Sequence, residues 1–510
     1  MSARRHPDHP RTSPRRRWPK TLLRVAVVTI AVLAPIAVVG VTNATTYLET
    51  LYAPAADTTV PVSLRDTKPP PHDPAKPTAV VLVGNQGAHV GDVLDPYETF
   101  AATGAFNLYT VAPERKLVTL TGGLDLVPDL SFAELTKRLA NAAPDVIAVP
   151  QMPEADALTT GPLNAWLVRQ AQGGALVLGV CIGAEVLASA GLLDGRDATS
   201  HWFRLKALEK RHPAVRWHRA TRYVDDGDVI TTGGVLSGID GALRVIERVL
   251  DGRAATAAAA TVGWKHYSPG KPAPLPHSTF GLRDTIAGVN LTFRPRPTIG
   301  VLLTDGIGEI ELASIFATYT EASYAARTVA LGVGSTAPVR SRHGLAFVPR
   351  GDVYAESGLD RLLVPGAEAA RRRAGDALPL VAEYPHARAG FAFDVALRDM
   401  ARTIDVPTAR WRAKTLEYPA YELTEVTGPG WPWGATLLPL LYAIIGLAVI
   451  AAVWLALRAR HAGRPGSDRP PSGISPASTL DTNASGGTPN RVADSDTATA
   501  TGRVSQPARR

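Results

Sequence analysis

Residues 175–195 read ALVLGVCIGAEVLASAGLLDG, an apolar run that turns at Cys181 and continues at once in a helical pattern. Small residues on both sides of Cys181 allow a tight turn that lifts its side chain off the end of a strand, which is the layout of a nucleophile elbow. The first amides of the helix would point at the sulfur and favour thiolate, so we expect a thiol more acidic than an ordinary cysteine. The alternative is a cysteine that packs as a small buried hydrophobic side chain.

Strand-like and helical segments alternate on the N-terminal side of this turn. The sequence predicts strands at 78–84, 106–112, 145–150 and 175–180, and helices at 94–104 and 163–174. Such alternation predicts an α/β fold with a parallel sheet covered by helices on both faces.

The same pattern restarts after a predicted linker at 266–296. GLAFVP (344–349) lines up with GLDLVP (123–128), and RLLVPG (361–366) lines up with VIAVPQ (146–151). We interpret 297–415 as a truncated second copy, which ends before any counterpart of the strand, cysteine and helix at 175–190. Pairing with the first copy would cover the edge of its sheet.

Two apolar runs flank this region, at 21–42 and 435–457, and each is long enough to cross a bilayer. Lys and Arg gather on the terminal side of both runs, which indicates that both termini are cytoplasmic and that 43–434 lies outside. We therefore predict a multi-pass cell-membrane protein with a basic N-terminus (1–20), an extended linker (43–76) and a disordered cytoplasmic tail (458–510). A cleaved signal peptide is the alternative for the first run.

The net charge of +8 is confined to the two ends of the chain. Residues 1–20 carry a net +6 and residues 458–510 a net +4, which leaves −2 for the rest. A basic groove on the folded part is therefore not expected, and neither is a nucleic-acid partner. The single cysteine excludes a disulfide framework and a zinc-type cysteine cluster. The twelve His show no metal-ligand spacing, so no metal and no cofactor is expected.

CIGAEVLASAGLLDGRDATSHW (181–202) resembles the elbow segment of the DJ-1/PfpI superfamily, the class I glutamine amidotransferase-like fold. It is most similar to the branch that contains isonitrile hydratase and the amidase-like sensor domains of AraC-type regulators. GDVLDPYETF (91–100) and the segments at 110–132 and 230–246 match in pattern as well, so the resemblance covers about 77–265. It implies a flavodoxin-like sandwich. No helix-turn-helix pattern follows this domain, so the DNA-binding half of such regulators is missing.

The resemblance implies four site residues. Cys181 matches the nucleophile, Asp92 the acid near it, and His201 the histidine downstream of the elbow. Ile182 stands where a threonine is common, so only its backbone N–H remains to steady developing charge. The alternatives are a plain helix N-cap for Asp92 and a hydrogen-bonded structural role for His201. The family's glycine-rich oxyanion loop is replaced at Gln151.

Two functions follow from these residues. One is an enzyme that uses the cysteine to hydrate or hydrolyse a small carbon–nitrogen compound, as a hydratase, amidase or other hydrolase or lyase. The other is a non-enzymatic module that senses a small molecule and signals through the second span. Redox sensing by the thiol is a variant of the second function. A homodimer is a further expectation.

Overall fold

The computed structural model describes residues 18–462 except 66, 154–156, 374, 389, 420–422 and 424. One compact unit extends to Ala452 and contains every element below apart from the end of the last helix. Residues 453–462 are that helix end and belong to a second unit.

The first sheet has seven strands in the order β10-β11-β7-β6-β1-β2-β5. Only β10 and β11 run antiparallel, so the predicted α/β class with a mainly parallel sheet is confirmed. The strands are β1 (Thr78–Leu82), β2 (Asn107–Ala112), β5 (Leu130–Ser131), β6 (Val146–Val149), β7 (Leu176–Gly179), β10 (Tyr223–Asp226) and β11 (Val229–Thr232).

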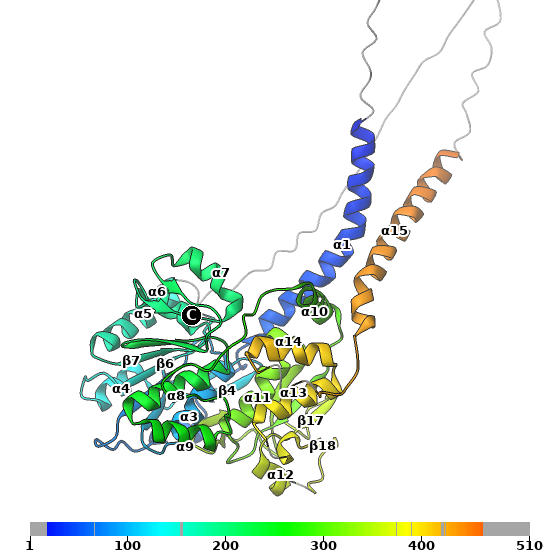
Figure 1. Ribbon diagram of the computed structural model, residues 1–510. Helices are drawn as coiled ribbons and strands as arrows, with labels where there is room; N and C mark the ends of the chain where they lie inside the picture. Colours follow the sequence, from blue (N-terminus) through cyan, green and yellow to red (C-terminus); the bar gives the residue numbers. More distant parts are fainter. Residues whose placement is uncertain are drawn as a thin grey trace, which may run out of the picture. The chain divides into compact units, whose positions relative to one another are not determined.

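Helices cover both faces of this sheet (Figure 1). Alternate residues of β1 belong to different cores, because successive side chains of a strand point to opposite faces. Val81 belongs to the core that also holds residues of α3 and α8, and Val80 to the core with residues of α5 and α6. The helices are α3 (Val90–Ala101), α4 (Phe132–Arg138), α5 (Ala157–Gln172), α6 (Gly183–Ser189), α7 (Trp202–Arg211), α8 (Ser237–Val249) and α9 (Gly252–Thr261). A short pair, β8 (Asp197–Ala198) and β9 (Arg216–Trp217), lies beside them.

A second sheet has five parallel strands in the order β16-β13-β12-β17-β18. These are β12 (Thr298–Leu302), β13 (Arg327–Gly332), β16 (Gly351–Asp352), β17 (Arg361–Leu363) and β18 (Ala382–Glu383). The prediction that this region ends before a counterpart of the strand at 175–180 is wrong, because β18 pairs with β17 as β7 pairs with β6. Only two residues of β18 pair with β17, and one of them, Glu383, is charged. The sequence therefore contains no apolar run that predicts this strand.

A small antiparallel sheet, β14-β15-β4-β3, joins the two regions. Its strands are β3 (Val118–Leu120), β4 (Leu124–Val127), β14 (Val339–Arg340) and β15 (Ala346–Val348). Phe347 of β15 lies opposite Leu126 of β4, and each is the fourth residue of its segment, GLAFVP or GLDLVP. The helices of the second region are α11 (Glu309–Tyr319), α12 (Ala367–Arg373), α13 (Ala392–Thr403) and α14 (Val406–Leu416), with short 3-10 turns η1 (Glu321–Ser323) and η2 (Pro385–Ala387). Helix α11 packs against α3.

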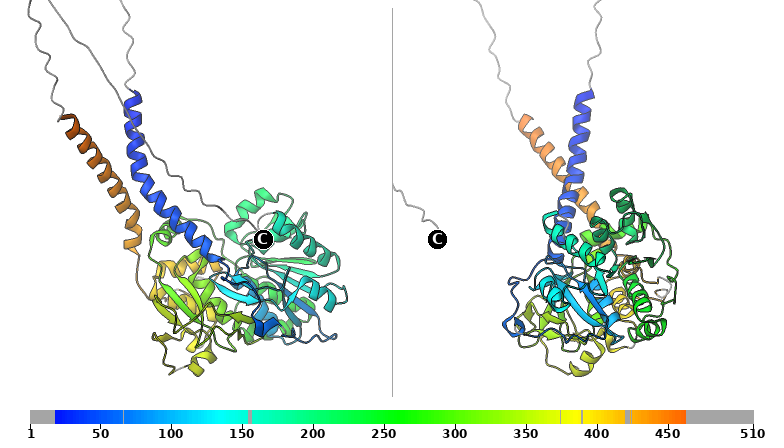
Figure 2. Two further views of the ribbon diagram at one scale, coloured as in Figure 1. Left: turned by 180° about the vertical axis from the view of Figure 1, so that it is seen from behind. Right: turned by 90° about the vertical axis from the view of Figure 1, so that its left-hand side faces the viewer.

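The flanking helices are longer than predicted. Helix α1 spans Trp18–Leu51 and α15 spans Trp433–Ala462, and both are long and apolar enough to cross a membrane (Figure 2). The predicted extended linker at 43–76 is therefore wrong over 43–51, where no proline or glycine stops the helix, and it also contains α2 (Val62–Arg65). The predicted linker at 266–296 contains α10 (Leu282–Phe293), which the Asp284 carboxylate caps. The predicted tail begins inside α15, and its residues 463–510 lie outside the described part of the chain.

Candidate functional site

The structure places Cys181 between β7 and α6, as the sequence predicts. Its φ of 55° is in the left-handed region, which a residue with a Cβ adopts only when its surroundings hold it there. The Cys181 N–H donates to Thr232 Oγ1 at 3.0 Å, which ties the turn to the end of β11. Gly183 makes the turn possible, because a Cβ there would lie 2.0 Å from the carbonyl oxygen of Val149.

Asp92 lies in the first turn of α3, fully buried. The N-cap of α3 is His89, so the interpretation of Asp92 as a plain N-cap is wrong. Asp92 Oδ2 accepts a hydrogen bond from the Gln151 backbone N–H at 3.0 Å, and Asp92 Oδ1 lies 3.1 Å from His89 Nδ1. The loop at Gln151 therefore orients the carboxylate with its backbone, and the Gln side chain is not needed for this.

A buried ion pair lies behind Asp92. His89 Nε2 is 2.5 Å from Glu321 Oε2, and Glu321 comes from η1 in the second region. Burial of the ring lowers the pKa of His89, but the carboxylates of Glu321 and Asp92 outweigh burial and raise this pKa to about 10. The raised pKa favours a protonated ring at neutral pH, and His89 Nδ1 lies 3.1 Å from both Asp92 Oδ1 and the Asp92 backbone nitrogen. Arg412 of α14 adds a second buried cation, whose Nη2 lies 3.6 Å from Glu321 Oε2.

The end of α14 covers the elbow. His201 Nε2 lies 2.8 Å from the carbonyl oxygen of Thr415, and the Leu236 N–H donates to the carbonyl of Leu416 at 3.2 Å. His201 is also the N-cap of α7, where its Nδ1 accepts from the Phe203 N–H at 3.3 Å. Both ring nitrogens are thus engaged, which matches the structural alternative for this histidine. Its proposed part in catalysis has no support in these contacts.

The expected acidic thiol is not found. Burial raises the pKa of Cys181 well above its usual range, and the carboxylates of Asp92, Glu321 and Glu417 raise it further. The Ile182 N–H hydrogen-bonds to the sulfur and lowers this pKa, but it does not offset the other effects. Cys181 is only 3% exposed, so the elbow is closed in this state.

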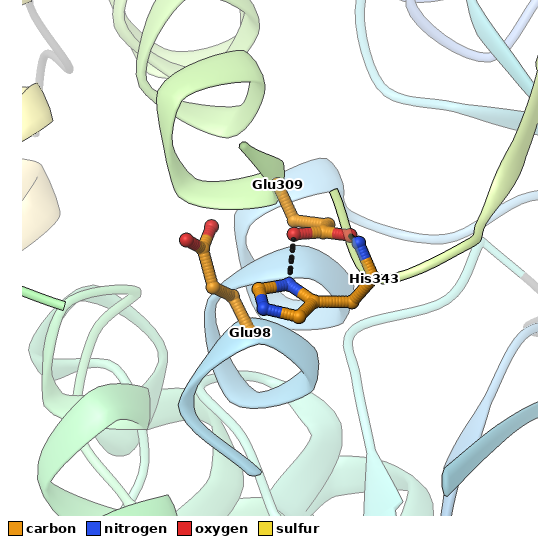
Figure 3. A group of neighbouring side chains, drawn as sticks. All are labelled: Glu98, Glu309 and His343. Carbon is orange, nitrogen blue, oxygen red and sulfur yellow. Dashed lines mark hydrogen bonds and ion pairs between the residues drawn. The ribbon is translucent and has the colours of Figure 1, made fainter. Parts of the chain in front are cut away.

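Three ligand-type side chains meet where α3 packs on α11 (Figure 3). Glu309 Oε2 lies 2.8 Å from His343 Nδ1, and Glu98 Oε1 lies 2.9 Å from Arg342 Nη1. Glu98 Oε2 accepts from a backbone N–H, and Glu309 Oε1 from a serine hydroxyl. Because every carboxylate oxygen already accepts a hydrogen bond, the cluster fits a polar joint between the two regions better than a metal site.

A cavity of about 630 Å³ lies away from the elbow, beside β18 and α13. Its walls carry charges of both signs, among them Glu383, Arg398 and Arg402. Arg402 is bonded to Asp399 and Glu383, and Asp399 also pairs with Arg361. The cavity therefore does not belong to the cysteine site.

Sequence reasoning missed His89, Glu321, Arg412 and Glu417. Glu321 and Glu417 lie more than 130 residues from the elbow along the chain, so no local motif could join them to Cys181. His89 lies two positions before the matching segment GDVLDPYETF, and a histidine at the start of a helix was its only signal.

The fold and the site together define the class of protein. It has a flavodoxin-like α/β fold, a cysteine on a strained strand-to-helix turn (a nucleophile elbow) and a buried carboxylate near that cysteine. Residues 77–248 match the model of the DJ-1/PfpI family, and the chain carries a DJ-1/PfpI family domain. Among relatives, isonitrile hydratase of Pseudomonas putida is 31% identical over 160 residues, which is 31% of this chain and 66% of that protein. The HTH-type transcriptional regulator GlxA of Rhizobium meliloti is 40% identical over 81 residues, 16% of this chain and 25% of that protein.

A solved structure of a ThiJ/PfpI family protein from Pseudomonas syringae is 24% identical. It covers 42% of this chain and 85% of its own, with a TM-score of 0.33. The match to isonitrile hydratase thus spans just under two thirds of that enzyme, and the match to the regulator spans a quarter.

Proposed function

We propose that the DJ-1/PfpI domain is a thiol enzyme that hydrates or hydrolyses a small carbon–nitrogen compound. The observation that carries this proposal is the strained elbow at Cys181, with φ 55°, the Ile182 N–H on the sulfur and the Asp92 carboxylate nearby. A strained backbone conformation persists only when the surrounding structure holds it, and such conformations are typical of active sites and ligand-binding sites. The similarity to isonitrile hydratase supports the choice of a carbon–nitrogen substrate.

For an isonitrile, the Cys181 thiol passes its proton to the Asp92 carboxylate, and the resulting thiolate attacks the terminal carbon. An S–C bond forms while Asp92 delivers that proton to the same carbon. Water then adds to the same carbon as the nitrogen gains a proton. The S–C bond breaks, the thiol is restored, and an N-substituted formamide leaves. The Ile182 amide steadies the sulfur before attack.

A non-enzymatic sensor is the second candidate, and the closed elbow favours it. Cys181 is 3% exposed, its pKa is raised by burial, and the end of α14 covers it. A ligand that displaced α14 would change the segment leading into α15. The similarity to a transcriptional regulator supports a ligand-binding role for the same domain. Redox sensing needs a thiolate that a reagent can reach, and burial opposes it in this state.

We also infer that 297–415 is a second copy whose sheet, within the described residues, lacks counterparts of β10 and β11, and in which α13 and α14 stand for α8 and α9. The strand order β16-β13-β12-β17-β18 supports this, since β5-β2-β1-β6-β7 of the first sheet has the same sequence of partners. Asp405 caps α14 as Asp251 caps α9, each accepting from the third amide of its helix. The β15–β4 pairing about Phe347 and Leu126 supports a local twofold relation.

Membrane anchoring is a further part of the proposal. The length and composition of α1 and α15 support two spans, and the basic flanks support cytoplasmic termini with 43–434 outside. The protein, as a monomer or a homodimer, would then bind its soluble substrate outside the cytoplasm.

The test is turnover of a small organic isonitrile by the full chain in detergent, with the N-substituted formamide as the product measured. We expect formamide from wild type and none from Cys181→Ser. A thiol that iodoacetamide alkylates, without any formamide, would favour the sensor. A ligand that slows alkylation would then be the positive evidence for sensing.

A further inference from the structure

The Glu417 side chain from the second region lies inside the cysteine site of the first. Glu417 follows α14 with φ 58°, a left-handed conformation unusual for a residue with a long side chain. The residue is 4% exposed, and its Oε2 accepts a hydrogen bond from Ser237 Oγ at 2.6 Å. A buried carboxylate needs such hydrogen-bond partners. We call the residues of the first region that surround the Glu417 carboxylate the seat.

Two glycines form the floor of this seat. A Cβ on Gly233 would lie 2.3 Å from Glu417 Oε2, and one on Gly234 would lie 2.8 Å from its Cγ. Glycine at both positions therefore leaves the room that the carboxylate occupies. The preceding residue, Thr232, holds the Cys181 N–H at 3.0 Å, which puts the seat next to the elbow.

A buried arginine lies beside the same seat and contacts Glu417 through its backbone oxygen. Arg222 is 2% exposed, and its Nη1 lies 3.5 Å from Ser237 Oγ and 3.4 Å from the backbone oxygen of Glu417. Asp240 Oδ2 also lies 3.5 Å from Arg222 Nη1. Arg222 Nε has no hydrogen-bond partner within the described part of the chain. The guanidinium is thus not saturated, and α8, which begins at Ser237, points its positive end the same way.

We propose that Gly233, Gly234, Ser237 and Arg222 form a carboxylate subsite beside Cys181, in which Glu417 stands in for the carboxylate of a small anionic substrate. This inference rests on the proposed function, because it assumes that Cys181 is the reacting group. It narrows the substrate class to small molecules that carry a carboxylate near the reacting carbon. Glu417 blocks the subsite until the end of α14 withdraws.

Helix α14 is held in place by buried apolar side chains, among them Ala413 and Leu416, and its end makes polar contacts with the first region. They include the hydrogen bond of His201 to the Thr415 carbonyl and that of the Leu236 N–H to the Leu416 carbonyl. A substrate carboxylate would take over the Ser237 hydrogen bond from Glu417. The exchange replaces one carboxylate with another, so Ser237 donates to a carboxylate both before and after it.

The test is protection of Cys181 from iodoacetamide in the full chain, with acetate as the probe and acetamide at equal concentration as the neutral control. We use wild type and Glu417→Gly, since glycine suits the left-handed conformation and keeps the end of α14. Acetate should slow alkylation in Glu417→Gly and have little effect in wild type, where Glu417 fills the seat. Ser237→Ala in the Glu417→Gly background should weaken acetate protection about tenfold, the loss of one charge-assisted hydrogen bond.

Each outcome separates the two proposals. Alkylation of Glu417→Gly that acetate and acetamide slow equally would overturn the carboxylate subsite and leave the thiol as a nucleophile. A Cys181 that stays inert in both variants, yet reacts after unfolding in SDS, would overturn the proposed function and the subsite with it. A circular dichroism spectrum of Glu417→Gly equal to that of wild type verifies that the fold is kept.

Discussion

Because His89 lies in an ion pair between the two regions and has a raised pKa, we expect the stability of their interface to depend on pH. The substitution His89→Asn removes the cation that Glu321 and Asp92 share, while asparagine remains a good N-cap for α3. The variant leaves the buried Asp92 carboxylate without its cation, and Glu321 keeps only the more distant Arg412, 3.6 Å away. Breaking a buried pair in this way costs about 3–5 kcal/mol, so we expect a clearly lower unfolding midpoint near neutral pH.

The pH dependence has a definite sign. The pKa of His89 is raised from 6.5 to about 10, so the folded protein holds one more proton than the unfolded chain between these values. The stabilisation from His89 is complete below pH 6.5 and is lost as pH rises through about 10. At about 1.4 kcal/mol per pH unit, this interval corresponds to about 5 kcal/mol, in line with the cost of breaking the pair.

The assay is thermal unfolding of the full chain in detergent, followed by tryptophan fluorescence between pH 6 and pH 10. The midpoint difference between wild type and His89→Asn should be largest at pH 6–6.5 and should shrink toward pH 10. His218→Asn is the matched control, because His218 pairs with Asp197 on the surface and its side chain is 51% exposed. An exposed pair contributes at most about 1 kcal/mol. A constant midpoint difference for His89→Asn across the range would refute the protonated ring.

Three more predictions follow from the elbow and the flanking helices. Asp92→Asn should shift the pH profile of Cys181 alkylation to lower pH, because the Asp92 charge raises the pKa of the thiol; an unmoved profile would exclude the carboxylate as a neighbour of the sulfur. Gly183→Ala should cost about 1–3 kcal/mol of stability through its clash at the turn, and an unchanged unfolding midpoint would contradict the close packing. A reporter active only outside the cytoplasm should work when fused at Ala55 and fail after Arg510, and the reverse pattern would overturn the predicted orientation.

The first sheet and the elbow could be predicted because their signals are local. A continuous apolar strand, a turn of small residues and an immediate helix all lie within 175–195, and the observed β7 and α6 lie inside that stretch. The strand at 146–149 is an apolar run of the same kind, and the strand at 107–112 contains the tyrosine, threonine and valine that are typical of strands. The predicted boundaries differ from the observed ones: α3 begins at Val90, four residues before the predicted start, because His89 caps it.

The surroundings of the thiol could not be predicted. The sequence indicated the helix amides that favour thiolate, but not the burial and the carboxylates that oppose it, since Glu321 and Glu417 reach the site only through the folding of a distant region. One helix terminus contributes about 0.3–1 kcal/mol in exposed cases. Full burial of an ionisable group shifts its pKa by up to about 3–5 units, so burial decides the direction.

The second region explains why only one elbow is present. In the register of β18 on β17, Leu363 lies opposite Glu383, just as Ala148 of β6 lies opposite Leu178 of β7. Cys181 follows Leu178 by three residues, and the residue three after Glu383 is His386.

His386 is buried, and both of its ring nitrogens are used, by the Gly366 N–H at 3.0 Å and by Ser314 Oγ at 3.2 Å. Since Nδ1 accepts from Gly366, Nε2 carries the ring proton and cannot remove one from Ser314. The pKa of His386 is lowered, first by burial, which keeps the ring neutral. The second region therefore offers no nucleophile at this place. If both copies carried an elbow, the helix equivalent to α14 in each copy would have to leave an elbow accessible. In the proposed duplication only one site remains. The end of the other copy can therefore cover it with Glu417, while η1 of the same copy contributes Glu321, which makes the closed elbow a consequence of the fused second region.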